Sequence, residues 1–257
     1  MQASPFFRDR KRLAEIYEPL SRWTNWWFQF RDDDGDGLPQ YNHGNDSGWD
    51  NATPFLAGVP LEAPDLQAHL VVQMDVLADI AKRIGKPADA RRWKVRADEH
   101  LAHMLKAFWR EDHLVAYRSG DTNMKPAPGD SSFLFLPIVL GQRLPKDIQT
   151  RLLDGLKESG RFLTKYGLAT ESVRSSLYEP DGYWRGPIWA PSTMLFVEGI
   201  AAVGDKAFAD ELSRRFADAL ANSQMPENFD ALTGKDRRDP GYTWTSSVYL
   251  MLAPSAP

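Results

Sequence analysis

Apolar residues recur at three- and four-residue steps over much of the chain, which predicts a protein built from amphipathic helices. The clearest case is residues 11–31, where one predicted apolar stripe contains Leu13, Ile16, Leu20, Trp23, Trp27 and Phe30. A second helix is predicted over residues 65–84, with Asp65 as its cap and Gly85 at its end. Because proline is tolerated in a first helical turn, a third helix is predicted from Pro87 to residue 108.

The second half of the chain predicts shorter helices separated by long aperiodic stretches. Residues 131–140 are almost wholly apolar and predict a buried helix. Amphipathic spacing predicts four more, over residues 146–159, 190–203, 206–221 and 242–252. Between them, residues 161–189 and 224–241 have no period, while residues 113–118 predict a strand or hairpin arm. Strands and helices do not alternate, so we predict an all-α fold, an array or toroid of helical hairpins forming a single domain over residues 1–257.

Composition narrows the class of protein. The 257 residues are 42% hydrophobic and 26% charged, which is typical of a globular protein in water. A net charge of -4 gives no electrostatic reason to expect nucleic acid or an anionic membrane as a partner. The absence of cysteine excludes disulfides, thiolate metal sites and a cysteine nucleophile. No apolar run is long enough to span a bilayer or to form a signal peptide, so a cytoplasmic location is expected.

The most polar stretch of the chain is residues 32–51, DDDGDGLPQYNHGNDSGWDN. Six aspartates, three asparagines and four glycines in this stretch exclude a regular helix or strand and predict a shaped loop. The chain also has nine tryptophans, several of them beside polar loops, and the apolar faces of sugars stack well on such rings. Carboxylates, amides and indoles together indicate a site that holds and cleaves a sugar.

Glycosidic cleavage typically needs two carboxyl groups, one on each side of the scissile bond. Asp50 fits the general acid, because Trp49 and nearby indoles could shield its carboxyl from water and raise its pKa. Glu227 fits the general base, as a lone glutamate in a polar loop. On spacing alone, an alternative is equally consistent: Asp50 caps a turn and Glu227 caps a helix.

Four motifs, taken in order, resemble a known family: SGWDN at 47–51, YWRGPIW at 183–189, ENFD at 227–230 and GYTWT at 241–245. This combination is similar to the (α/α)6-barrel hydrolases of glycoside hydrolase family sixty-three. That family includes processing α-glucosidases and bacterial mannosylglycerate and glucosylglycerate hydrolases, and trehalases are more distant relatives with the same toroid. The resemblance extends from about residue 23 to residue 252.

The resemblance implies a role for individual residues. In that family the aspartate of the GWD motif is the general acid and the glutamate of the late motif is the general base of an inverting reaction. These roles fall on Asp50 and Glu227. The residues implied to line the sugar pocket are Trp49, Asn51, Tyr183, Trp184, Arg185, Gly186, Trp189 and Trp244. The guanidinium of Arg185 could bind vicinal hydroxyls or a substrate carboxylate, or it could pair with a loop aspartate.

The implied activity is the release of glucose or mannose from a small α-linked glycoside or oligosaccharide, with no cofactor required. A closed toroid needs more helices than the eight segments predicted here, so the toroid is expected to be incomplete at its N-terminal side. A homodimer is expected to cover the apolar faces this leaves. Two alternatives stay open: a non-catalytic carbohydrate-binding or interaction remnant of such an enzyme, and a trehalase-like hydrolase. The trehalase is disfavoured because YWRGPIW replaces the QWD pattern of trehalases.

The start of the polar loop has the spacing of a calcium-binding loop. Asp32, Asp34 and Asp36 alternate before Gly37, as oxygen ligands do before the glycine turn of an EF-hand. The glutamate that completes such a loop is missing, because His43 stands at the twelfth position. Two interpretations follow, a structural calcium ion held by the three aspartates and a solvated loop turned by its glycines.

Overall fold

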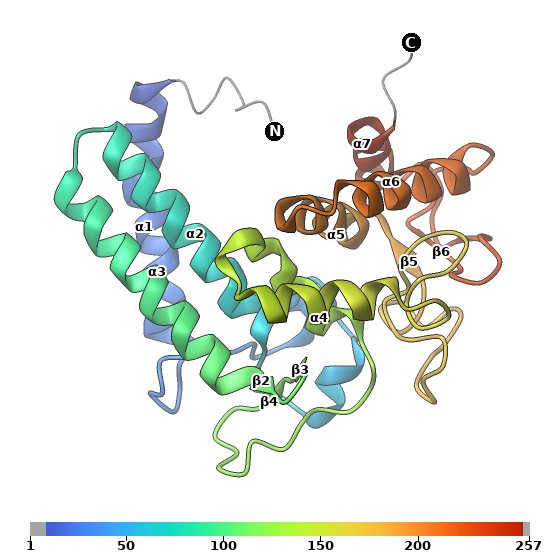
Figure 1. The fold of residues 1–257 in the computed structure, drawn as a ribbon, viewed down its shortest axis with the longest axis horizontal. Helices are drawn as coiled ribbons and strands as arrows, with labels where there is room; N and C mark the ends of the chain where they lie inside the picture. Colours follow the sequence, from blue (N-terminus) through green and yellow to red (C-terminus); the bar gives the residue numbers. More distant parts are fainter. Residues whose placement is uncertain (1–8, 254–257) are drawn as a thin grey trace.

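The structure, a computed structural model, describes residues 9–253. Its helices form two layers along an arc (Figure 1). The inner helices follow one another in contact: α2 (Pro64–Arg83), η4 (Ser132–Arg143), α5 (Ala190–Val203) and α7 (Thr243–Leu252). The outer helices pack on them: α1 (Arg10–Phe30), α3 (Pro87–Phe108), α4 (Lys146–Lys157) and α6 (Lys206–Leu220). All eight predicted helical segments are therefore present, and the all-α prediction is confirmed.

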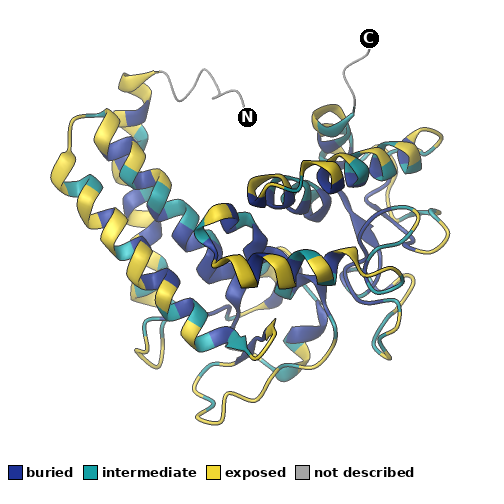
Figure 2. Cartoon of the chain, viewed as in Figure 1, coloured by how far each residue is buried: buried dark blue, intermediate teal, exposed yellow. Residues whose placement is uncertain are grey.

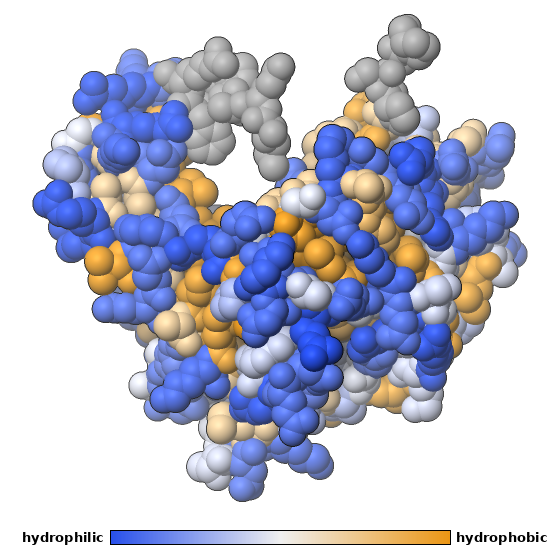
Figure 3. Space-filling view, viewed as in Figure 1, coloured by the Kyte–Doolittle hydropathy of each residue, from blue (hydrophilic) through white to orange (hydrophobic). Residues whose placement is uncertain are grey.

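Burial separates the two layers. The inner helix α2 buries residues around much of its circumference, whereas the outer helices bury one face and expose the other (Figure 2). Buried side chains from Leu13 to Leu212 form one continuous apolar cluster, and a smaller cluster gathers around Phe216 and Phe229. In the space-filling view the molecule is hollowed between the α1–α2 side and the α5–α7 side (Figure 3).

Two helical predictions differ from the structure in detail. The apolar segment 131–140 forms a 3-10 helix rather than an α-helix, and its backbone breaks at Gly141, which has φ 56°. The helix from residue 65 begins earlier, at Pro64, with Ala63 as its N-cap. Asp65 is therefore not the N-cap but a residue of the first turn, where its buried carboxylate accepts a 2.7 Å hydrogen bond from the Tyr41 hydroxyl.

The predicted single stripe of α1 is also wrong. The face that packs on the molecule contains Leu13, Tyr17, Ser21 and Thr24. Trp23 and Phe30 are 57% and 52% exposed, so they belong to a second apolar face that points away from α2 and α3. Within residues 9–253, no helix is both long enough and apolar enough to cross a membrane.

Short strands and 3-10 turns shape the loops at one end of the inner helices. The paired strands are β1 (Leu61–Glu62) with β4 (Tyr117–Arg118), β2 (Trp109–Arg110) with β3 (His113–Leu114), and β5 (Ile188–Trp189), β6 (Asn228–Phe229) and β7 (Asp236–Arg237) in a three-stranded sheet. All pairs are antiparallel. The strand or hairpin arm predicted at 113–118 is confirmed, whereas the strands inside 224–241 were not predicted.

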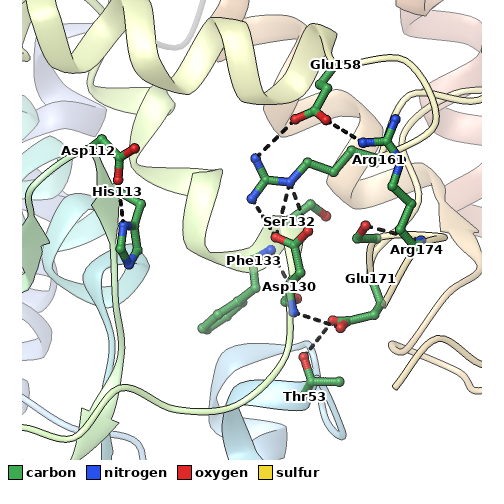
Figure 4. Close-up of polar contacts among 12 residues, drawn as sticks. Thr53, Asp112, His113, Asp130, Ser132, Phe133, Glu158, Arg161, Glu171 and Arg174 are labelled. Carbon is green, nitrogen blue, oxygen red and sulfur yellow. Dashed lines mark hydrogen bonds and ion pairs between the residues drawn. The ribbon is translucent and has the colours of Figure 1, made fainter. Parts of the chain in front are cut away.

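Buried polar contacts tie the loops from the two halves of the chain together (Figure 4). The carboxylate of Glu171, which has no solvent exposure, accepts hydrogen bonds from the Thr53 hydroxyl (2.6 Å) and the Asp130 backbone N–H (2.8 Å). Two side-chain nitrogens of Arg161 donate hydrogen bonds to the Asp130 carboxylate at 2.6–3.2 Å. Thr53 closely follows the GWDN motif, so this network fixes one predicted site loop against the middle of the chain.

Candidate active site

A row of tryptophans connects the loops that carry the four motifs. The rings of Trp49 and Trp184 lie 4.8 Å apart, those of Trp184 and Trp189 stack at 4.0 Å, and those of Trp189 and Trp244 lie 5.5 Å apart. The first three rings are 4%, 3% and 0% exposed. They therefore pack on one another beneath the site, and Trp244 keeps a partly exposed face.

The YWRGPIW loop is folded tightly by its own residues. The Trp189 indole N–H donates to the Tyr183 carbonyl at 2.9 Å, and the Gly186 N–H donates to the Thr170 hydroxyl at 2.9 Å. A Cβ at position 186 would lie 2.3 Å from the Glu179 carbonyl oxygen, so only glycine fits there. Thr170 ends the segment Gly-Leu-Ala-Thr at 167–170, and its hydroxyl also donates to the Pro187 carbonyl at 3.0 Å, so this segment packs against the loop.

Asn51 joins this loop to the GWDN motif. Its side chain donates to the Gly182 carbonyl at 3.1 Å and accepts from the Trp184 N–H at 3.0 Å. The guanidinium of Arg185 donates to the Asn51 carbonyl at 2.8 Å and lies 3.5 Å from the Glu179 carboxylate. Arg185 thus binds backbone and Glu179 rather than a loop aspartate.

Asp50 is placed by a short 3-10 turn, η2 (Gly44–Ser47). The side chain of His43 caps this turn by accepting from the Asn45 N–H at 3.1 Å, and the Asp46 carboxylate accepts from the His43 N–H at 3.0 Å. The Asp50 carbonyl packs so closely on Gly44 that a Cβ there would be 1.7 Å from its oxygen. Position 44 therefore has room only for glycine beside the Asp50 backbone, and the side chain of Asp50 is half-buried.

Glu227 lies at the start of β6, where it caps no helix. The Trp244 indole N–H donates to its carbonyl at 3.2 Å, and its N–H donates to the Asp239 carbonyl at 2.8 Å. Burial is the main cause that raises the pKa of the Glu227 carboxyl, with the charge of Asp239 adding to it. The hydroxyls of Tyr183 and Tyr242 are close enough to hydrogen-bond to the carboxylate and oppose this shift.

The charges of both candidate carboxyl groups reach Tyr183. Its pKa is raised first by burial and then by the negative charges of Asp50 and Glu227. Its backbone is in the left-handed region, with φ 64°, which is uncommon outside glycine. The loops therefore bring Asp50 and Glu227, which are 177 residues apart in the sequence (227 minus 50), within electrostatic reach of one tyrosine.

The aspartate-rich loop forms a separate acidic cluster. Carboxylate oxygens of Asp32, Asp34 and Asp36 lie within 4.8 Å of one another. A pocket of about 360 Å³ beside them is also lined by Glu62, which is 1% exposed and has no hydrogen-bond partner meeting normal geometry. Burial, followed by the charges of Asp36 and Asp34, raises the pKa of Glu62 to about 7, although the nearby hydroxyls of Ser119 and Tyr117 oppose the shift.

Sequence reasoning missed Glu62 because it follows the loop by 26 residues (62 minus 36). The chain returns there through the antiparallel bridge between Tyr41 and Leu61. A glutamate in a strand of apolar residues, LEAP, is the one signal that could have found it. Asp34, Asp36 and Glu62 all line this pocket, and carboxylates are ligands suited to a hard cation such as Ca²⁺.

Known proteins share both sequence and fold with this chain. A family model described as the mannosylglycerate hydrolase MGH1-like glycoside hydrolase domain matches residues 1–245. Mannosylglycerate hydrolase of Thermus thermophilus is 29% identical over 167 residues, covering 64% of this chain and 38% of the relative. Glucosylglycerate hydrolase of Mycolicibacterium hassiacum is 26% identical over 207 residues, covering 78% of this chain and 46% of the relative. The matched part of the chain thus spans less than half of the length of these relatives.

The fold is that of a solved relative. The glycoside hydrolase family sixty-three mannosylglycerate hydrolase of Thermus thermophilus, solved with glucose, superimposes with a TM-score of 0.81 at 22% identity, covering 98% of this chain and 71% of that one. The same hydrolase solved with Tris and D-glycerate gives a TM-score of 0.84 at 20% identity, covering 98% of this chain and 74% of that one. The helical layers are therefore those of an (α/α)6-barrel, and the chain belongs to the family of mannosylglycerate hydrolase MGH1-like glycoside hydrolases.

Proposed function

We propose that this protein is an inverting glycoside hydrolase that releases glucose or mannose from a small α-linked glycoside, with Asp50 as general acid and Glu227 as general base. Its relatives are named for the hydrolysis of mannosylglycerate and glucosylglycerate, which makes glycerate conjugates the first substrates to test. Membership of the family supports glycoside hydrolysis, and the roles of Asp50 and Glu227 are proposed in addition.

The observation that carries the proposal is that the charges of both carboxyl groups reach Tyr183. Asn51, next to Asp50, binds the residues on both sides of Tyr183, and a row of packed tryptophans joins the Trp49 that precedes Asp50 to the Trp244 that holds the Glu227 backbone. Glycosidic cleavage typically uses such a pair of carboxyl groups.

The proposed step is a single displacement. Glu227 takes a proton from water as the water oxygen bonds to the anomeric carbon, and the bond from that carbon to the aglycone oxygen breaks. Asp50 gives its proton to the departing oxygen. Because water enters opposite to the leaving group, an α-linked substrate yields the β-anomer and a free alcohol. Tyr183, Asn51 and Trp244 are proposed to bind and orient the sugar in this reaction.

The test is proton NMR of the purified protein with α-glucosides and α-mannosides, including both glycerate conjugates and trehalose. We expect the β-anomeric sugar to appear first from at least one substrate. First appearance of the α-anomer contradicts inversion. Hydrolysis of trehalose alone favours the trehalase-like alternative. Binding of sugars by folded protein without any turnover favours the non-catalytic alternative.

Two variants separate the roles of the carboxyl groups. Asp50→Asn is expected to lower kcat on glycosides by about 10²–10⁴-fold but to spare an α-glycosyl fluoride, whose leaving group needs no proton. Glu227→Gln is expected to lose both activities, because water then has no base. Equal loss of both substrates in Asp50→Asn contradicts its assignment as the acid.

We also propose that Asp32, Asp34 and Asp36 hold a structural calcium ion beside the pocket that Glu62 lines. Glu62 supports this proposal, because a buried carboxylate facing two others is unfavourable unless a cation or a proton neutralises it. Calcium, titrated into chelator-treated protein and followed by calorimetry, is expected to bind and to raise the melting temperature. Glu62→Gln should weaken binding, whereas Glu99→Gln on the exposed side of α3 should not; equal affinity in both contradicts the proposal.

A further inference from the structure

We propose that Arg238, held by Asp181, is a positioning residue for Glu227: it fixes the loop that carries Glu227 against the loop that carries Tyr183 and keeps a positive charge beside the carboxylate. The inference rests on the proposed role of Glu227 as general base, and it adds a residue outside the four motifs. Arg238 follows β7, in a stretch of the sequence that carries no recognised motif.

The backbone around Arg238 is paired directly with the backbone around Glu227. The Glu227 N–H donates to the Asp239 carbonyl, the Gly241 N–H to the Gln224 carbonyl and the Tyr242 N–H to the Met225 carbonyl, each at 2.8 Å. Residues 238–242 therefore lie alongside residues 224–227. The segment that carries Arg238 is thereby joined by hydrogen bonds to the segment that carries Glu227.

Backbone strain concentrates at this place. Five described residues other than glycine have positive φ, and three of them belong to the two site loops: Tyr183 (64°), Met225 (52°) and Arg238 (62°). Such conformations are unfavourable for residues with a Cβ and persist where surrounding contacts hold them, commonly at functional sites. The loops that carry the proposed base and Tyr183 are therefore held in place by their surroundings.

The side chain of Arg238 spans the two loops. One of its terminal nitrogens donates to the Asp181 carbonyl at 3.0 Å and lies 3.1 Å from the Asp181 carboxylate. The two side chains are 42% and 53% exposed, and an exposed ion pair by itself stabilises a fold little. Asp181 adjoins Gly182, whose carbonyl accepts a hydrogen bond from Asn51. The contact between Arg238 and Asp181 therefore connects the loop of Glu227 with the loop of Tyr183, and Asn51 ties the latter to the loop of Asp50.

Arg238 and Asp239 have opposite effects on the pKa of Glu227. Asp239 disfavours the ionised carboxylate, whereas the positive charge of Arg238 favours it. The hydroxyls of Tyr183 and Tyr242 also favour ionisation, and Asp50 is the other carboxylate whose charge reaches Tyr183. A general base must be ionised to accept a proton, so the arginine supports the state that the reaction uses.

The experiment compares Arg238→Gln, Arg238→Lys and Asp239→Asn in the full chain. Glutamate is labelled with ¹³C at the carboxyl, the Glu227 signal is assigned with Glu227→Gln, and its pH titration is followed by NMR. Removing the positive charge should move the titration of Glu227 to higher pH, and removing the negative charge of Asp239 should move it to lower pH. Arg238→Lys should lie near the wild type, because the charge is kept.

The same variants are assayed for turnover. Arg238→Gln is expected to shift the acidic limb of the kcat/KM profile in the same direction as the titration and to lower kcat by about tenfold at the plateau, with little change in KM. An unmoved titration and limb, together with only a lower melting temperature, would show a merely structural arginine and overturn the inference. If the wild type hydrolyses nothing, the proposed function fails, while the NMR titrations still decide the role of Arg238.

Discussion

At the scale of single residues, the tightest constraint on the site is the contact between Gly44 and the Asp50 carbonyl. Any Cβ at position 44 would stand 1.7 Å from that oxygen, so a larger residue must displace the backbone that carries the proposed acid. Gly48, four residues on, has a left-handed backbone with φ 72° but nothing within 4 Å of a Cβ. Substituting Gly44 therefore tests the effect of a steric clash, and substituting Gly48 tests the effect of backbone strain alone.

We predict that Gly44→Ala lowers kcat by about 10²-fold, because small displacements of a catalytic group are costly. Gly48→Ala should lose about 1–2 kcal/mol of stability through its backbone and keep most of its activity. Steady-state kinetics and urea unfolding of both variants measure the two effects. Wild-type kcat in a folded Gly44→Ala protein would contradict the placement of Asp50.

Asp65 gives a second prediction, in pH dependence. Burial raises its pKa from 3.8 to about 7. A folded-state pKa above the unfolded one means that the folded state binds the proton more tightly, so this contribution to stability is complete below pH about 4 and is lost as the pH rises through about 7. Asn can still accept the Tyr41 hydrogen bond without titrating.

Asp65→Asn should therefore flatten the decrease in the free energy of unfolding between pH 5 and pH 8. Urea unfolding at both pH values, in the presence of a chelator, measures this decrease. Glu62 titrates in the same pH range, so the variant removes only the part of the pH dependence of stability that comes from Asp65. An unchanged slope would mean that Asp65 is not protonated in the folded protein.

At the scale of elements, periodicity predicted the existence of every helix but not the geometry of each. Amphipathic spacing finds α3, α4 and α6 because each buries one side against the core. It cannot separate a 3-10 from an α-helix in the apolar run of η4, where nearly every residue is buried. It also merged the two faces of α1, because aromatic residues occur on both.

Candidate site residues could be predicted from the sequence only where they stand in local motifs. The tryptophans, Asn51 and the two carboxyls stand in motifs, and the structure brings those loops together. Glu62 and Arg238 have no motif: one reaches its pocket through a two-residue strand, and the other through backbone pairing across the loop 224–241. Pairings between such short strands depend on tertiary contacts, which period and propensity do not contain.

The contact that most directly joins distant elements is the buried carboxylate of Glu171. In Glu171→Gln the amide nitrogen must face either the Thr53 hydroxyl or the Asp130 N–H, and the latter can only donate. We predict a loss of about 1–3 kcal/mol in the free energy of unfolding. Glu158→Gln, which breaks half-exposed ion pairs in the same network, should cost less than about 1 kcal/mol (Figure 4). Equal losses in the two variants would contradict a special role for the buried group.

At the scale of the whole molecule, the arc of helices has two ends, and both expose apolar side chains. At one end, α1 presents Trp23, Trp26 and Phe30, which are 57%, 37% and 52% exposed. At the other, α7 presents Leu250 and Met251, which are 79% and 58% exposed. The solved relative contains further chain, because the match covers 74% of it. Contiguous aromatic faces of this kind commonly mark interfaces.

We predict that a second copy of the chain covers the outer face of α1. Three large aromatics on one helix supply the kind of anchor that dominates interfaces, since each buries extensive apolar area. Sedimentation equilibrium should then show a dimer at micromolar concentration. Trp23→Glu should shift the protein to monomer without unfolding it, because Trp23 lies outside the buried face of α1. Val95→Glu is the matched control: Val95 is 54% exposed on the neighbouring helix α3, where it stands apart from the aromatic face. A wild-type monomer, or dissociation equally strong in both variants, would leave the α1 face open to water and contradict the prediction, whereas selective dissociation by Trp23→Glu would identify the edge of the arc as the dimer interface.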